Sequence, residues 1–107
     1  MDAIELFNWI GNARDREGDM TLRRLQTLLL IYDAGKGGIS MSEIVRRTKS
    51  TSAGTTKLVQ SWSNRTAAKT RGPAYVVARA DQDNLSTKTV YITQRGQRAV
   101  GELLSDA

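Results

Sequence analysis

Hydrophobic residues recur at helical spacing in two stretches of the first third of the chain. Apolar positions between residues 3 and 13 predict a helix with Asp2 as its N-cap, and the charged segment 14–18 is expected to end it. The second stretch has its apolar stripe at Leu22, Leu25, Leu28, Leu29 and Tyr32. Gly35 follows this stripe and suits the left-handed C-cap position that ends many helices. The pattern therefore predicts two successive amphipathic helices.

Two shorter helices joined by a four-residue turn are predicted next. Ser40 to Glu43 matches the capping box S/T-x-x-E, whose side chains satisfy two free amides at a helix start. The first helix is expected to run to about Thr48, and the second from about Ser52 to Asn64. The inward face of the second helix is formed by Thr55, Leu58, Val59 and Trp62.

The pattern then changes to strand-like alternation. Pro73, the only proline, ends any helical pattern, and residues 74–78 are β-prone. Residues 81–84 form a turn cluster and 87–92 alternate like a second strand, which predicts a β-hairpin. A last helix is expected over about 93–104.

These elements predict an α+β protein: a mainly helical winged helix-turn-helix with a two-stranded β-hairpin wing and flanking terminal helices. In such an arrangement the second helix of the pair enters the major groove of DNA, and the hairpin is the wing. We expect residues 1–107 to form a single domain of this kind, in which the N-terminal helix, about 2–14, is a candidate dimerisation element.

The composition is that of an ordinary globular protein, with 39% hydrophobic and 25% charged residues among 107. The longest apolar runs, such as Leu28 to Tyr32, are far shorter than the roughly 20 residues that span a bilayer. The acidic N-terminus lacks the basic segment of a secretory signal, and the absence of cysteine gives no indication of an oxidising compartment. We therefore expect a cytoplasmic protein without a membrane partner.

The absent residue types narrow the chemistry. With neither histidine nor cysteine, the usual zinc sites, cysteine nucleophiles and Ser-His-Asp triads are excluded. Asp81 and Asp83 are close together, but they lie in the predicted turn and are interpreted as loop residues rather than an acid/base pair. The run Gly35-Lys36-Gly37-Gly38 lacks the GxxxxGK(S/T) spacing of a phosphate loop. We predict that the protein is not an enzyme and has no cofactor or metal.

Charge is segregated along the chain. Between Glu43 and Asp81 there is no acidic residue, although this interval holds eight of the sixteen basic residues. The first twenty residues hold the acids Asp2, Glu5, Asp15, Glu17 and Asp19. A one-sided positive patch is the electrostatic footprint expected of a protein that binds a phosphate backbone. The alternative is a solvated basic face without a partner.

The predicted helix-turn-helix and wing indicate which side chains could contact DNA. On the outward face of the second helix of the pair, glutamine can pair with adenine, lysine with guanine and hydroxyls with either. The base-reading candidates are Ser52, Thr56, Lys57 and Gln60, and the alternative for them is an ordinary solvated helix face. The candidates for phosphate contact, of which about half to two-thirds should touch a duplex, are Arg46, Arg47, Lys49, Arg65, Lys69, Arg71, Arg79 and Lys88.

Three stretches carry a family resemblance: residues 39–48 before the turn, 55–59 in the second helix, and 81–98. The last includes Ile92-Thr93-Gln94-Arg95-Gly96, which looks like a Leu-Thr-x-x-Gly start of a final helix. Over about residues 20–104 the chain resembles the winged helix-turn-helix regulators of the MarR type, although several winged-helix families share this pattern. The resemblance implies transcription regulation, double-stranded DNA as a partner and a homodimer.

The chain also departs from that family. The link between residues 63 and 73 is longer than usual, and near the wing tip, where the family often has an arginine, this chain offers Asn84 and Lys88. In MarR-type proteins the terminal helices build the dimer interface and enclose a ligand pocket. Both are short here, which argues against a small-molecule effector.

The N-terminal helix is the candidate dimerisation surface. Ile4, Phe7 and Ile10 share one line along it, and Trp9 falls off that line. An exposed tryptophan beside an amphipathic helix suggests a partner surface, and a homodimer seam is the first candidate. The alternative for Trp9, packing onto its own domain, stays open.

Together these features predict sequence-specific binding of double-stranded DNA by a dimeric transcriptional repressor that acts by steric occupation of an operator. One alternative is a partition-type or architectural protein that coats DNA. Another is a winged-helix module that docks other proteins through its N-terminal surface.

Overall fold

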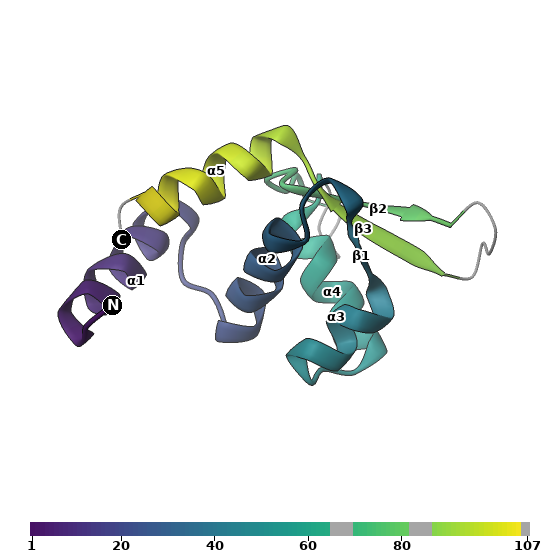
Figure 1. Ribbon diagram of the computed structural model, residues 1–107, viewed down its shortest axis with the longest axis horizontal. Helices are drawn as coiled ribbons and strands as arrows, with labels where there is room; N and C mark the ends of the chain where they lie inside the picture. The colour runs from purple at the N-terminus through teal and green to yellow at the C-terminus, as the bar shows by residue number, and fades with distance from the viewer. Residues whose placement is uncertain (65–69, 82–86, 106–107) are drawn as a thin grey trace.

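The computed structural model describes residues 1–64, 70–81 and 87–105. Its helices are α1 (Ala3–Glu17), α2 (Leu22–Ala34), the short 3₁₀ helix η1 (Gly35–Gly37), α3 (Met41–Thr48), α4 (Ser52–Trp62) and α5 (Gln94–Ser105). Its strands are β1 (Ile39–Ser40), β2 (Val76–Ala80) and β3 (Lys88–Ile92). Figure 1 shows the strands towards one end of the molecule, with α1 and the end of α5 at the other. None of the helices in these ranges is long and apolar enough to cross a membrane.

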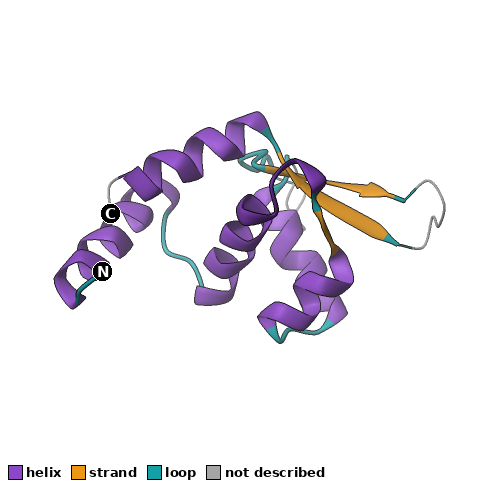
Figure 2. Ribbon diagram, viewed as in Figure 1, coloured by secondary structure: helices purple, strands orange, loops and turns teal. Residues whose placement is uncertain are grey.

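The sheet has the order β1–β3–β2, and both pairs of strands are antiparallel. The predicted hairpin is present, because β2 pairs with β3 along its whole length, but its first strand covers Val76–Ala80 instead of residues 74–78. The strand β1 is not among the predicted elements, since two residues are too few to show an alternating pattern. Its Ile39 lies opposite Val90 of β3. The winged-helix class is confirmed, with three strands in the sheet instead of two (Figure 2).

Two helix boundaries differ from the prediction. α1 continues through the charged segment to Glu17, because its solvent-exposed arginines and acids are compatible with a helix. Its C-cap is Gly18, whose φ of 80° suits a residue without a side chain. α4 ends at Trp62 rather than at Asn64.

The larger hydrophobic core joins α2, the pair α3–α4, the sheet and α5. It consists of Leu28, Ile31, Ile44, Val59, Trp62, Val76, Val90 and Val100. Trp62 is fully buried, as its place on the inward stripe of α4 predicts. Since burying one such side chain contributes about 1.5–3 kcal/mol, this core is what holds the helix pair against the sheet.

A second, smaller cluster lies between α1, α2 and α5 and buries Trp9, Ala13 and Leu103. Trp9 is only 6% exposed, and its indole N–H donates to the Leu103 carbonyl at 2.8 Å. The interpretation of Trp9 as an exposed partner residue is therefore wrong. Trp9 lies off the line of exposed apolar residues because it is on the side of α1 that faces α5.

Tyr75 joins the end of α4, the start of the sheet and the start of α5. Its amide donates to the Trp62 carbonyl at 2.8 Å, and its carbonyl accepts from the Thr93 amide at 2.9 Å. The Thr93 hydroxyl lies within hydrogen-bond distance of both the Ala74 and Tyr75 carbonyls, and it accepts from the Gly96 amide at 3.0 Å. Thr93 therefore caps α5 and fastens this helix to the chain that enters β2.

Close packing requires the glycine in the first turn of α5. A Cβ on Gly96 would lie 2.2 Å from the Tyr75 carbonyl oxygen and 2.7 Å from the Cδ1 atom of Ile92. The nearer obstacle is backbone that is already hydrogen-bonded to Thr93, so it cannot move aside easily. This close approach is a physical reason for the Thr-x-x-Gly pattern at residues 93–96.

We expect Gly96→Ala to lower the free energy of unfolding by about 1–3 kcal/mol, the usual cost of overpacking, because α5 has to move away from Tyr75. Thermal unfolding followed by circular dichroism measures this as a drop in Tm of roughly 4–8 °C per kcal/mol.

Gly101→Ala in the same helix is the matched control, since nothing lies within 4 Å of its added Cβ. It should be neutral or stabilising, because alanine favours a helix over glycine by about 1 kcal/mol. Equal Tm values for the two variants would contradict the close contact at Gly96.

Candidate nucleic-acid interface

Local contacts hold the turn between α3 and α4. Lys49 adopts the left-handed conformation (φ 54°, ψ 39°), and its amide donates to the Val45 carbonyl. The Ser50 amide donates to the same carbonyl at 3.2 Å. The Thr51 hydroxyl then caps α4 by accepting from the Gly54 amide at 2.9 Å. The chain thus reverses within the predicted turn, and the two helices form the expected helix-turn-helix.

α4 turns its polar face to solvent. Thr55, Val59 and Trp62 are buried on its inward side, as predicted. All four base-reading candidates are exposed: Ser52, Thr56, Lys57 and Gln60. The Thr56 hydroxyl donates to the Ser52 carbonyl at 3.0 Å, which leaves its lone pairs to accept a further hydrogen bond.

Two grooves border both α4 and the wing, which is the hairpin β2–β3, and the second of them also borders α3. The first, of about 410 Å³, has Thr56, Gln60 and Lys88 among its lining residues. The second, of about 370 Å³, is lined in part by Ser52, Thr56 and Lys88. The structure therefore brings three base-reading candidates together with one phosphate candidate from β3. Lys57 lines neither groove.

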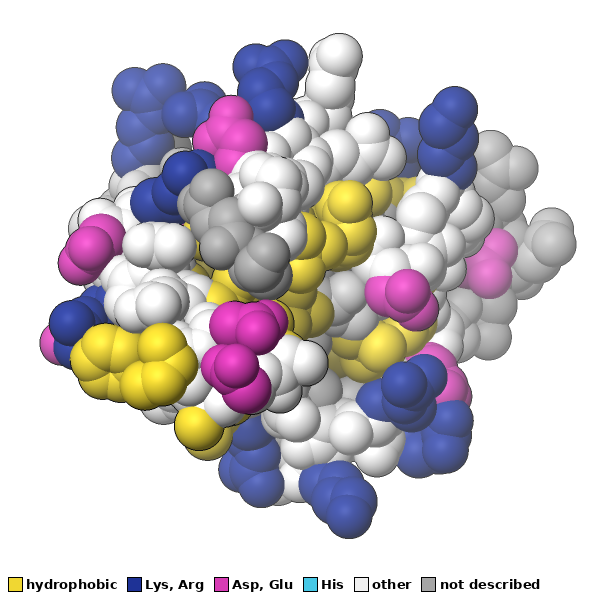
Figure 3. Space-filling model, turned by 60° about the vertical axis from the view of Figure 1, so that its left-hand side comes forward, with side chains coloured by type: hydrophobic (Ala, Val, Ile, Leu, Met, Phe, Trp, Pro, Cys, Tyr) yellow, Lys and Arg dark blue, Asp and Glu magenta, His cyan; other side chains and the backbone are white. Residues whose placement is uncertain are grey.

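The cations predicted to contact phosphates stand on α3, the turn, the wing and the segment before it. Exposed among them are Arg46, Arg47, Lys49, Arg71, Arg79 and Lys88. Arg65, Lys69 and the wing-tip Asn84 lie outside the described residues. In Figure 3, dark-blue side chains stand along the lower edge of the molecule, the edge at which α3 and α4 meet their turn in Figure 1, and others stand along its upper edge.

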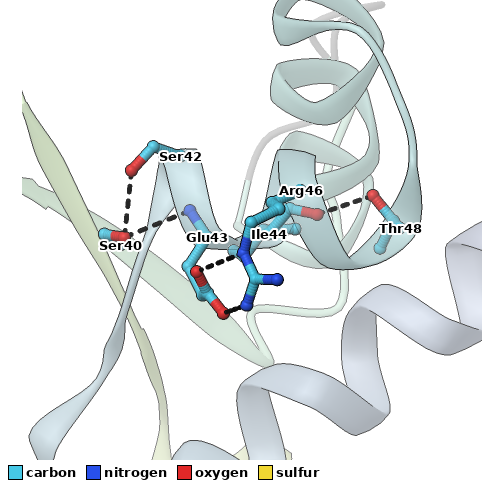
Figure 4. A network of polar contacts seen from close by, with 6 residues as sticks. All are labelled: Ser40, Ser42, Glu43, Ile44, Arg46 and Thr48. Atoms are coloured by element: carbon cyan, nitrogen blue, oxygen red, sulfur yellow. Dashed lines mark hydrogen bonds and ion pairs between the residues drawn. The ribbon is translucent and has the colours of Figure 1, made fainter.

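One of these cations is already paired within its own helix. The Glu43 carboxylate accepts from Arg46 Nε at 3.0 Å and also from Arg46 Nη2 (Figure 4). The hydrogen bond from Arg46 lowers the pKa of Glu43, and the bond to Glu43 raises the pKa of Arg46. The capping box is half formed as a result. The Ser40 hydroxyl accepts from the Glu43 amide at 3.2 Å, but the Glu43 side chain turns to Arg46.

Arg23 of α2 is a further cation of this surface, outside the set predicted from the sequence. Its side chain is exposed, and its Nη2 donates to the Lys49 carbonyl at 3.4 Å, which places a further guanidinium at the turn. Its position off the apolar stripe of α2 was visible in the sequence. That the start of α2 lies against the turn was not, because this is a contact between segments 26 residues apart.

Its neighbour Arg24 has a different role. The guanidinium lies 3.9 Å from the centroid of the Trp62 ring, and Nε donates to the Ser61 hydroxyl at 2.9 Å. Burial lowers the pKa of Arg24, and the charge of Glu17 opposes this effect. The Trp62 indole N–H donates back to the Arg24 carbonyl at 2.8 Å. Arg24 therefore holds the end of α4 against α2.

Neither a protein-family model nor a curated protein matches the sequence. Solved structures do match it. The MepR–DNA complex of S. aureus has a TM-score of 0.75 at 16% identity, over 97% of this chain and 77% of that chain. MarR has a TM-score of 0.67 at 16% identity, over 97% and 70%. A MarR-like transcriptional regulator from Thermotoga maritima has a TM-score of 0.63 at 26% identity, over 99% and 75%.

This chain has the MarR-type winged-helix fold. The likeness extends over nearly the whole chain and so includes α1, beyond the residues 20–104 on which the sequence showed the resemblance. In the geometry of winged helix-turn-helix proteins, α4 corresponds to the recognition helix and β2–β3 to the wing.

Removing the charge of Glu43 should release Arg46 for a phosphate. For Glu43→Gln we expect tighter DNA binding and a plot of log K against log salt that is steeper by about 0.9, the value for one further neutralised phosphate. Fluorescence anisotropy with a labelled duplex across a salt series measures both quantities.

Glu102→Gln is the matched control. It removes the same charge from an ion pair with Arg16, at 2.9 Å, that joins α1 and α5 away from the turn. This variant should leave the slope unchanged, and an equal change in both variants would indicate an effect of net charge alone.

Proposed function

We propose that this protein binds double-stranded DNA sequence-specifically and acts as a dimeric transcriptional repressor by occupying its operator. The observation that carries the proposal is the exposed polar face of α4 beside the wing, where Thr56 and Gln60 share a groove with Lys88. Groups that can hydrogen-bond to bases thus stand next to a cation that can bind the backbone. The segregation of positive charge along the sequence supports the same interface.

The structural likeness supports the proposal independently. The S. aureus MepR neighbour is described in complex with DNA, and the Thermotoga maritima neighbour is described as a MarR-like transcriptional regulator. One description is of a DNA complex and the other is of a transcriptional regulator, and neither names an enzyme.

Each part of the interface has a role under this proposal. α4 enters the major groove, where Gln60 pairs with adenine and Lys57 with guanine, and the hydroxyls of Ser52 and Thr56 bond to either. Apart from Arg46, which is paired with Glu43, the exposed cations of α3, the turn and the wing bind phosphates and fix the register on the duplex. Arg23 joins this second set through its place beside Lys49.

The homodimer is proposed to form through α1. Ile4, Phe7 and Ile10 are 68%, 72% and 44% exposed, and Leu22 and Leu104 are 76% and 43% exposed. Exposed apolar surface of this kind marks a partner site, and Figure 3 shows hydrophobic side chains open to solvent on the side that carries α1. A second copy would place two α4 helices in successive major grooves, about one helical turn apart.

The same apolar face supports a second candidate function, in which a winged-helix module docks a different protein through α1. A partition-type or architectural protein that coats DNA is an alternative that uses the DNA interface without sequence preference.

Two labelled duplexes distinguish these functions, one from the upstream region of the gene and one scrambled. By anisotropy across a salt series we expect at least a roughly thousandfold preference for the first duplex. Gln60→Ala should lower affinity for that duplex by about 1–3 kcal/mol and relax discrimination at one base pair, because a base contact is lost.

Gln97→Ala, an exposed glutamine of α5, is the control and should change neither affinity. Steep salt dependence without preference would favour the coating protein. Little binding to either duplex at low salt would contradict DNA binding and favour the docking module.

Phe7→Glu should convert the dimer into a monomer, because the new carboxylate would be buried in the seam. Sedimentation velocity of the full chain without DNA measures this. Gln60→Glu adds the same charge on the exposed face of α4 and should remain dimeric. A wild-type protein that is monomeric at every concentration would argue against dimerisation through α1.

A further inference from the structure

The last residue of α1 is tied to the segment between α4 and the sheet. The Tyr75 hydroxyl donates to Glu17 Oε1 at 2.6 Å. Glu17 ends α1, and Tyr75 directly precedes β2. One hydrogen bond thus connects the terminal helix with a residue 58 positions away.

Tyr75 is fastened in turn to the last residue of α4. Its amide donates to the Trp62 carbonyl at 2.8 Å, and the two rings stack with centroids 5.9 Å apart and planes at 17°. Trp62 is fully buried and carries the guanidinium of Arg24 on its ring. Because Tyr75 and Trp62 are joined by both backbone and ring contacts, a displacement of one has to displace the other.

The Glu17 contact differs in direction from other contacts of α1. The Trp9 indole N–H bonds to the Leu103 carbonyl, and Arg16 pairs with Glu102 at 2.9 Å. Both of these tie α1 to α5, which runs along the upper edge of the molecule in Figure 1, whereas the turn between α3 and α4 lies at the lower edge. Glu17 instead ties α1 to the residue that holds the end of the recognition helix.

We propose that Tyr75 is a positioning residue for DNA recognition: its hydrogen bond to Glu17 fixes the angle between α1 and α4, and thereby the separation of the two recognition helices of a dimer. This inference rests on the proposed function, since it requires a dimer formed through α1 and α4 in the major groove.

The physical basis is that a small rotation at one end of a helix produces a larger displacement at its other end. α4 has 11 residues and is therefore about 16 Å long, so a rotation of a few degrees at Trp62 displaces its other end by about 1 Å. The base-reading candidates Ser52 and Thr56 lie towards that other end, and hydrogen bonds to bases weaken steeply when they are misaligned. Burial, together with the hydrogen bond to Glu17, raises the pKa of Tyr75 to about 12, so the phenol remains a donor at neutral pH.

The test varies the spacing between half-sites. The probe is a palindromic duplex selected from a random library by the wild-type protein, with about one or two base pairs added or removed between its half-sites. A duplex with a single half-site reports the affinity of one recognition helix. Tyr75→Phe keeps the stacked ring and removes the donor, and Glu17→Ala removes the acceptor from the α1 side. Tyr32→Phe, which removes a phenol from half-buried Tyr32 in α2, is the matched control.

For the wild-type protein and Tyr32→Phe, we expect Kd to rise roughly tenfold or more when the spacing changes by one base pair. In Tyr75→Phe and Glu17→Ala the same change should raise Kd by less than about threefold, with the single half-site Kd within about twofold of wild type. Circular dichroism and Tm confirm that each variant is folded.

Wild-type spacing dependence in both variants would overturn the inference and leave the proposed function intact. An equal loss of affinity on single and paired half-sites would also overturn it, because Tyr75 would then act only on the stability of the monomer. Failure of the wild-type protein to bind any duplex, or a wild-type affinity that ignores spacing, would overturn the proposed dimeric recognition and the inference with it.

Discussion

The backbone of Tyr75 is the constraint on which the rest of the fold depends. Its amide bonds to the end of α4 and its carbonyl to the residue before α5, so elements distant in sequence meet at a single residue. Buried backbone groups have to be paired, and this junction pairs both groups of Tyr75. The first turn of α5 passes so close to the Tyr75 carbonyl that only glycine fits at position 96. The angle between the recognition helix and the wing follows from this packing.

The role of each arginine in this protein depends on the residues around it. Arg46 is held by Glu43 in its own helix, whereas Arg24 lies on the ring of Trp62 and serves the core. Arg23, one residue away, reaches the turn beside Lys49 and strengthens the positive surface. Adjacent residues of one helix point in different directions, so Arg24 has a structural role and Arg23, with the same charge, has an electrostatic one.

α1 connects the fold to the surface proposed for the second copy. One side of the helix buries Trp9 and Ala13 in the smaller cluster, and the other leaves Ile4 and Phe7 in solvent. Removing apolar area from water is favourable by about 25 cal/mol per Å². This free energy favours burial of the side of α1 that carries Ile4 and Phe7. Since the same helix ends at Glu17, the proposed dimer seam and the recognition helix are linked through few intermediates.

The sequence by itself determined the order of the main elements, the helix caps at Asp2 and Ser40, and the polar outward face of α4. These follow from helical and strand periodicity and from short-range hydrogen bonds, which are properties of neighbouring residues. Tertiary structure alone decided the rest. The strand β1 exists because β3 supplies its partner, and Trp9 is buried because α5 covers that side of α1. The tie between Glu17 and Tyr75 joins residues that no local pattern relates. Such contacts depend on how elements far apart in sequence pack together, and this information is absent from the spacing of residues within any one element.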